Sequence, residues 1–165
     1  MITKFEGKPV KLNGKFVNVG DKAPNFELVK TDLSTLSLDS LKGKRVVLNI
    51  FPSLDTGICA ASVRHFNTAA ADLENCVVLA ISKDLPFAHD RFCTTEGIEN
   101  VISLSDFRNT QFVDAYGLLM QDGPLEGLLA RAVVVIDEKG VVKYKELVPE
   151  IKQEPNYEGA LDALK

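Results

Sequence analysis

The chain has 165 residues, and its 19 lysines and arginines against 23 aspartates and glutamates give a formal net charge of −4. A negative net charge argues against a nucleic-acid partner, because binding the phosphate backbone requires a basic face, although net charge alone leaves local basic patches open. The N-terminus carries no apolar leader, and the longest apolar run, residues 76–81, is far too short to cross a membrane. These features predict a cytoplasmic protein with no membrane partner.

Length and composition predict one domain over residues 1–165, in which residues 1–19 form an N-terminal hairpin extension. A chain of this size buries roughly 70% of the surface that its unfolded form exposes, so it needs no disulfide framework. Asn13-Gly14 lies between alternating apolar residues, and this dipeptide favours a type I′ turn. The sequence therefore predicts a hairpin that pairs residues 10–12 with residues 15–17.

The first long apolar strand is expected over residues 46–51. A short strand over residues 26–29 and one helical turn over residues 38–41, ended by Gly43, precede it. The strand itself is almost continuously apolar, which is typical of a central strand covered on both faces. Pro52 ends it.

A helix is predicted to begin between Gly57 and Cys59, with Thr56 as its N-cap. Apolar side chains recur along it at spacings of three and four residues, at positions 59, 63, 66, 70 and 73. Cys59 therefore lies in the first turn and faces the sheet, where unpaired N–H groups and the helix dipole favour an anion. We expect Cys59 to hold a thiolate and Asp55 to point to solvent.

The rest of the chain alternates predicted strands and helices. In order they are a strand over 77–81, a helix over 84–96 capped by Asp84 and ended by Gly97, a strand over 101–104, a helix from Asn109 to Tyr116 ended by Gly117, a loop over 120–127, strands over 132–136 and 141–147, and a helix over 157–164. This order predicts an α/β fold, a mixed central sheet flanked by helices.

Two stretches of the chain resemble a known family. Pro52, Thr56 and Cys59 match the P-x-x-x-T-x-x-C pattern of peroxiredoxins, and residues 52–57 and 84–87 resemble its thiol peroxidase branch, the atypical two-cysteine peroxiredoxins. A second cysteine, Cys93, follows in Arg91-Phe92-Cys93. The resemblance runs from about Val17 to the C-terminus and implies a thioredoxin-like fold.

The same resemblance implies a reaction and its residues. The chain would reduce hydrogen peroxide and organic hydroperoxides to water and alcohols through a sulfenic acid on Cys59, which Cys93 would resolve as an intrachain disulfide. Thr56 would bond the thiolate or the peroxide, Pro52 would shield the sulfur, and Arg131 occupies the place of the family's arginine. A thioredoxin-like reductant and a homodimer are implied as partners.

Each of these residues also has a plainer interpretation. Free cysteines are among the most buried residues, so Cys59 and Cys93 could simply fill the core. Arg131 taken alone would be a solvated surface residue. Cys76 opens a predicted strand and is expected to be structural.

The two histidines offer weak alternatives. His65 lies off the apolar stripe of its helix, so a Cys/His catalytic pair within that helix is not expected. His89 and Cys93 lie four residues apart on one helix face, where His89 could tune the thiol. No further close Cys/His pair completes a tetrahedral set, so no metal is expected.

Missing motifs narrow the function further. The sequence has no C-x-x-C, no G-x-G-x-x-G and no P-loop, so neither a dithiol exchanger nor a bound cofactor is expected, and electrons must arrive by thiol exchange. One rival is a non-enzymatic redox sensor or binding module that uses the same disulfide. The other is a cysteine hydrolase, which lacks a histidine placed to act as base.

The expected disulfide has a geometric requirement. Two helices that flank parallel strands normally hold their Cα atoms farther apart than the roughly 7 Å that a disulfide allows. The segments around Cys59 and Cys93 are therefore expected to unwind when the bond forms.

Overall fold

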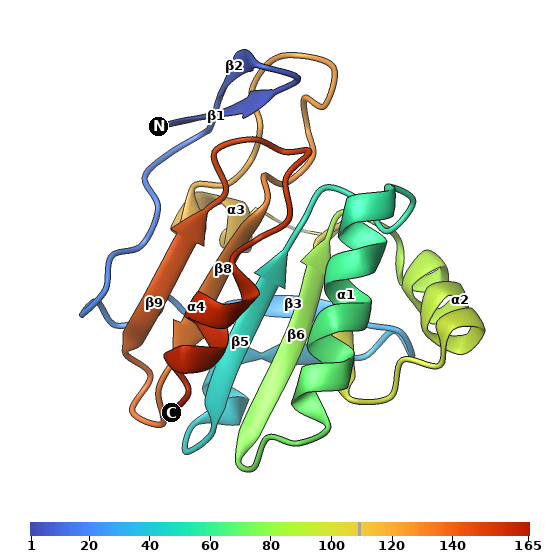
Figure 1. The fold of residues 1–165 in the computed structure, drawn as a ribbon, viewed down its shortest axis with the longest axis vertical. Helices are drawn as coiled ribbons and strands as arrows, with labels where there is room; N and C mark the ends of the chain where they lie inside the picture. The colour runs from blue at the N-terminus through green and yellow to red at the C-terminus, as the bar shows by residue number, and fades with distance from the viewer. Residues whose placement is uncertain (109) are drawn as a thin grey trace.

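The computed structural model describes residues 1–108 and 110–165. It contains a seven-stranded sheet with helices on both faces and a separate two-stranded N-terminal hairpin (Figure 1). The predicted mixed sheet, its flanking helices and the presence of a hairpin are thus confirmed. The strands are β1 (Ile2–Phe5), β2 (Lys8–Lys11), β3 (Glu27–Lys30), β4 (Thr35–Ser37), β5 (Arg45–Ile50), β6 (Cys76–Ser82), β7 (Val101–Ser105), β8 (Ala132–Ile136) and β9 (Val142–Leu147).

The sheet runs in the order β4-β3-β7-β6-β5-β8-β9. Its centre is parallel, because β5 pairs with β6 and β6 with β7 in the same direction, whereas β8, β9, β3 and β4 each pair antiparallel with their neighbours. The helices are the 3-10 turn η1 (Leu38–Leu41), α1 (Gly57–Ala70), α2 (Pro86–Glu96), α3 (Gln111–Tyr116) and α4 (Tyr157–Asp162).

Alternation along the buried strands divides the core into two layers. In β5, Val46, Leu48 and Ile50 belong to one layer, and Val47 belongs to the other. The second layer lies under α1, α4 and part of α2, and the first lies under η1 and α3. Figure 1 shows α1 and α4 in front of the sheet and α3 behind it. Successive side chains of a strand point to opposite faces, so one apolar run supplies both layers.

The N-terminal hairpin turns at a different place from the one predicted. Strands β1 and β2 pair antiparallel with Phe5 opposite Lys8, so the turn is made by Glu6 and Gly7. Both have positive φ, +52° and +80°, as a type I′ turn requires. The prediction of a hairpin turn at Asn13-Gly14 is therefore wrong.

Asn13 and Gly14 instead join the start of the chain to the segment after α3. The Asn13 side chain donates to the carbonyl of Val113 at 3.0 Å and accepts from the amide of Leu119 at 3.1 Å. A Cβ on Gly14 would lie 3.5 Å from the Cα of Gly117. These partners are about 100 residues away in the chain, and no local turn rule takes them into account.

Helix ends agree with the sequence where a glycine sets them. Gly97 and Gly117 end α2 and α3 in the left-handed conformation, as predicted. The predicted N-cap Asp84 is wrong, since α2 begins at Pro86 with Leu85 as its cap. The helix predicted from Asn109 begins at Gln111, and Asn109 itself lies outside the described residues. Strand β4 was not predicted.

Across the described residues, every helix is too short or too polar to cross a bilayer.

Candidate active site

Cys59 lies in the first turn of α1, where the chain turns back over the sheet after β5. Its side chain is 0% exposed and packs in the same core layer as Phe51 and Val63. Helical hydrogen bonding begins with the amide of Ala60 donating to the carbonyl of Thr56. The N–H groups of the first turn have no acceptor within the helix, and such groups form a suitable environment for a negative charge. The position predicted for Cys59 is the one observed.

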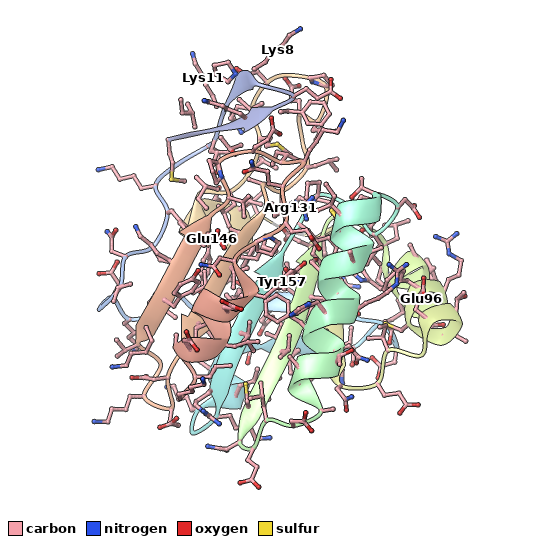
Figure 2. The ribbon with its side chains drawn as sticks, viewed as in Figure 1. Lys8, Lys11, Glu96, Arg131, Glu146 and Tyr157 are labelled. Carbon is pink, nitrogen blue, oxygen red and sulfur yellow. The ribbon has the colours of Figure 1, made fainter. Side chains whose placement is uncertain are left out.

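Arg131 is the charged partner of this sulfur. Its guanidinium Nη2 donates to Cys59 Sγ at 3.2 Å, and its Nε donates to the carbonyl of Ile151 at 2.9 Å. The residue is 2% exposed, so it is not the solvated arginine of the plainer interpretation. Figure 2 shows Arg131 near the N-terminal end of α1, above Tyr157 of α4.

The register of the sheet brings Arg131 to Cys59. Ala132 pairs with Ile50, so the residue before β8 lies beside the end of β5, from which the loop to α1 departs. Little water screens the interaction between this positive charge and the sulfur, because both groups are buried. Within the described residues, Nη1 of Arg131 has no hydrogen-bond partner.

Two distant segments hold Arg131 in place. Ile151 accepts from Arg131 through its carbonyl and donates its own amide to Lys4 of β1 at 2.8 Å. Next to it, the carboxylate of Glu150 accepts from the amides of Glu6 and Gly7 in the hairpin turn. The amide of Lys152 and then these two amides lower the pKa of Glu150. No local pattern of residues indicates this link.

A cleft of about 410 Å³ opens beside the buried sulfur. Most of its walls are apolar. It is lined by Phe5, Pro52, Thr56, Gly57, Ile58, Leu125, Arg131, Ile151 and Lys152. The lining thus combines the hairpin, the loop after β5, the loop predicted over 120–127 and the segment after β9. Three of the predicted site residues, Pro52, Thr56 and Arg131, meet at this cleft.

Thr56 takes a different hydrogen bond from the one that the resemblance implied. It is the N-cap of α1, but its side chain makes no capping bond. Its Oγ1 donates instead to the carbonyl of Ser53 at 3.0 Å, which tightens the loop between Pro52 and the helix. A role for its hydroxyl toward the thiolate or the peroxide stays a prediction.

Asp84 fastens that loop to the start of α2. Its carboxylate accepts from Ser53 Oγ at 2.8 Å, from the amide of Leu54 at 2.8 Å and from Ser82 Oγ at 2.6 Å. Sequence reasoning singled out Asp84 as a helix cap and missed this role. The only available signal was a carboxylate before a proline, which fits both uses.

Asp55 points to solvent, as predicted. Its side chain is 72% exposed and lies 3.3 Å from Arg91 of α2. Such an exposed pair contributes little to stability, but it keeps the carboxylate away from the buried sulfur.

Cys93 packs against the same core layer as Cys59 but has its own partner. It is half-buried, and its Sγ lies 3.2 Å from Ser103 Oγ of β7. Burial raises the pKa of the Cys93 thiol, and the Ser103 hydrogen bond partly offsets that effect. All three cysteines are free thiols, so the structure represents the reduced protein.

The two histidines and Cys76 lie away from the cleft and have other surroundings. His89 Nε2 lies 3.0 Å from Ser82 Oγ, and burial lowers the pKa of His89 to about 4, so the ring is neutral at pH 7. His65 stacks on Tyr157 at 3.8 Å. Cys76 opens β6, and burial raises its pKa. No cluster of three or more metal-ligating side chains occurs among residues 1–108 and 110–165.

Comparisons with known proteins agree with this geometry. A thiol peroxidase from Corynebacterium glutamicum is 54% identical over 162 residues, 98% of each chain. A peroxiredoxin-like protein from Aquifex aeolicus superposes with a TM-score of 0.94 at 41% identity, covering 99% of this chain and 95% of that one. A thiol peroxidase from Chromobacterium violaceum has the same fold, with a TM-score of 0.90 at 22% identity over 99% and 95% of the two chains. These likenesses confirm the predicted thioredoxin-like fold. Residues 18–161 match the Redoxin family, and the chain therefore belongs to it.

Proposed function

We propose that the chain is a thiol-dependent peroxidase that reduces hydrogen peroxide and organic hydroperoxides at Cys59. The observation that carries this proposal is the Arg131 guanidinium 3.2 Å from a fully buried sulfur, beside an open, largely apolar cleft. A resting thiolate next to a substrate-sized opening is what peroxide reduction requires.

In the first step, the Cys59 thiolate attacks the outer oxygen of the peroxide. An S–O bond forms as the O–O bond breaks, leaving a sulfenic acid and an alkoxide or hydroxide that takes up a proton. The leaving oxygen gains negative charge in the transition state, so a nearby donor lowers the barrier. Arg131 Nη1 would be this donor, because it has no hydrogen-bond partner among the described residues. Pro52 and Thr56 would shield and orient the reacting atoms.

In the second step, Cys93 resolves the sulfenic acid. Its thiolate attacks the Cys59 sulfur, an S–S bond forms, the S–O bond breaks, and water leaves after proton uptake. The two sulfurs are held by different partners in the reduced protein, so both segments must rearrange. We infer that the first turn of α1 and the segment around Cys93 unwind, and a thioredoxin-like protein then restores both thiols.

Mass spectrometry after one equivalent of hydrogen peroxide tests both steps. We expect a Cys59–Cys93 disulfide in the unmodified sequence. Cys59→Ser should consume no peroxide, and Cys93→Ser should turn over once and then stall with thioredoxin. Cys76→Ser is the matched control and should keep full turnover. Steady turnover by Cys93→Ser would remove the resolving role while leaving the peroxidase step intact.

A redox sensor with the same disulfide is distinguished by rate. Stopped-flow oxidation of Cys59 should exceed about 10⁴ M⁻¹s⁻¹, the low end of ordinary enzyme efficiency. A much smaller rate constant would favour the sensor.

The three free thiols fit a reducing compartment, which supports a cytoplasmic location.

We further propose that the chain forms a homodimer. Leu85, Phe87 and Phe107 are 51%, 67% and 43% exposed, and they follow the C-terminal ends of the neighbouring strands β6 and β7. Large apolar side chains gathered at one end of a sheet are characteristic of an interface. Analytical ultracentrifugation should give twice the mass of the chain, and Phe87→Glu should give monomers. A monomeric parent protein would contradict this proposal.

A further inference from the structure

Cys93 has one specific tie to the sheet beneath it. Its Sγ and the hydroxyl of Ser103 lie 3.2 Å apart, and Ser103 is 5% exposed. This is the hydrogen bond that the structure gives to the Ser103 side chain. The contact joins the helix of the proposed resolving thiol to the middle of β7.

Few residues of the helix that carries Cys93 are buried. Only Pro86 and His89 of α2 are fully buried among its eleven residues. Its ion pairs lie toward solvent: Arg91 in the middle of α2 pairs with Asp55, and Glu96 at the C-terminal end pairs with Arg64. Exposed ion pairs contribute little. The buried contact of His89 with Ser82 and the part-buried contact of Cys93 with Ser103 therefore tie α2 to the sheet, and the second of them holds the turn that carries Cys93.

Release of Cys93 competes with a second oxidation. The sulfenic acid on Cys59 either forms the disulfide and releases water, or attacks a second peroxide molecule. In the second case an S–O bond forms, the peroxide O–O bond breaks, and an irreversible sulfinic acid is left together with water or an alcohol. Any contact that holds Cys93 on β7 slows the first outcome and favours the second. The contact with Ser103 has to break before the two sulfurs can meet.

We propose that Ser103 is a positioning residue that retains Cys93 on β7 until Cys59 is oxidised, and thereby sets the partition of the sulfenic acid between disulfide and sulfinic acid. This inference rests on the proposed resolving role of Cys93. Ser103 contacts neither the cleft nor Cys59 in the structure, so the first oxidation step does not depend on it.

A pair of nearly equal shape isolates the hydroxyl. Ser103→Thr keeps the hydroxyl and adds a methyl group, whereas Ser103→Val has the same volume without the hydroxyl. One neutral hydrogen bond corresponds to a change of about two- to tenfold in an equilibrium. After one equivalent of hydrogen peroxide, quenched-flow mass spectrometry should show the Cys59–Cys93 disulfide forming faster by that factor in Ser103→Val than in Ser103→Thr.

Two further readouts separate this role from a general loss of stability. With excess hydrogen peroxide, Ser103→Val should accumulate less Cys59 sulfinic acid than Ser103→Thr. In the reduced proteins, iodoacetamide should label Cys93 faster in the valine variant. Tyr116→Phe is the control, because it removes another interior hydroxyl, which donates to Pro24 at 2.8 Å in the other core layer, and should change neither readout.

The outcomes are decisive. Equal rates in the pair would overturn the proposal, and slower disulfide formation in Ser103→Val would show that the hydroxyl assists the attack. Ser103→Ala supplies the same comparison if the larger side chains do not fold. Oxidation of Cys59 without any Cys59–Cys93 bond in the parent protein would contradict the resolving role itself, whatever the variants do.

Discussion

Arg131 is a buried cation whose three nitrogens have three different surroundings. Nε is fixed by the carbonyl of Ile151, Nη2 bonds Cys59, and Nη1 is without a partner among the described residues. A buried charge is costly unless it is paired, so the hydrogen bonds to the Cys59 sulfur and the Ile151 carbonyl stabilise the buried arginine. Because the guanidinium is planar and rigid, Nε can anchor the side chain to Ile151 while Nη2 contacts Cys59.

Arg131→Lys should therefore oxidise Cys59 more slowly, although it keeps the positive charge. An ammonium cannot bond Ile151 and Cys59 in this fixed geometry, so we expect the rate constant for Cys59 oxidation to fall about tenfold. Arg131→Gln should lose about 10²- to 10³-fold, the usual effect of removing a transition-state donor. Stopped-flow measurements with hydrogen peroxide check both values.

The control for this pair is Arg64→Gln, which removes an exposed arginine of α1. It should oxidise like the parent protein. Full activity in Arg131→Lys would mean that charge alone matters and that the fork geometry does not.

Single residues were predictable where their chemistry is local. The cysteine at a helix start after a buried strand indicated Cys59, and Arg131 followed from its place before an apolar strand and from the family resemblance. Ser103 and Ile151 were missed because their partners, Cys93 and Arg131, come from other elements. A side chain with one distant partner leaves no periodic trace in the sequence.

At the scale of elements, the loop after β5 and the start of α2 behave as one unit. Asp84 accepts hydrogen bonds from Ser53 and Leu54 on one side and from Ser82 on the other. The loop carries Pro52 and Thr56, so this carboxylate helps to define the cleft. The same carboxylate links the helix of Cys59 to the helix of Cys93.

Asp84→Asn should loosen both ends of that unit. An amide oxygen cannot replace both carboxylate oxygens, so we expect a loss of about 1–3 kcal/mol in unfolding free energy. Amide exchange of residues 53–56 should also become faster. Urea unfolding and exchange mass spectrometry are the measurements.

Asp90→Asn is the matched control, because Asp90 is an exposed aspartate on α2, the helix that Asp84 precedes. It should leave both quantities unchanged. Unaltered exchange in the loop of Asp84→Asn would show that other contacts hold the loop.

Two helix-ending glycines share a conformation but differ in surroundings. Gly97 has φ +66° with open space where a Cβ would lie, whereas Gly117 has φ +68° with Lys15 O only 2.5 Å from that position. Gly97→Ala should cost about 1 kcal/mol of unfolding free energy, the usual effect of a left-handed alanine. Gly117→Ala should cost about 3 kcal/mol or more, because backbone must move.

Urea unfolding of the two alanine variants measures the difference. Equal losses would mean that the chain near Lys15 yields easily, and that Asn13 and Gly14 do not pin it against α3.

Most elements were predictable because apolar runs and helix-ending glycines act locally. The central strands and α1 were expected within a residue or two of their observed bounds. The hairpin turn was misplaced because Asn13 satisfies distant groups instead of turning the chain. Strand β4 was missed because only its pairing with β3 makes it a strand, and two of its three residues are polar.

At the scale of the whole molecule, two buried groups give opposite responses to pH. Burial raises the pKa of Asp106 to about 6, although Lys83 lies 3.3 Å away, and burial lowers the pKa of His89 to about 4, although Asp84 opposes it. Between pH 4 and 6, the folded protein holds a proton on Asp106 that the unfolded chain has released. Over the same range it lacks a proton on His89 that the unfolded chain binds.

Asp106 therefore lowers the unfolding free energy as pH rises from about 4 to 6, and His89 raises it. Relative to the parent protein, Asp106→Asn should gain up to about 3 kcal/mol across this window, and His89→Gln should lose a similar amount. Urea unfolding at several pH values gives both curves. Parallel curves for the parent and both variants would show that neither group titrates differently on folding.

The anchoring of Arg131 through Ile151 to Lys4 also determines when the site around Cys59 can form during synthesis of the chain. During synthesis, the reactive cysteine leaves the ribosome long before residue 131 and the segment that braces it. In the growing chain, Cys59 therefore has no hydrogen bond from the Arg131 guanidinium. Peroxide reactivity at Cys59 should therefore develop only after residues 131 and 151 have been synthesised and have packed against the segment around Lys4.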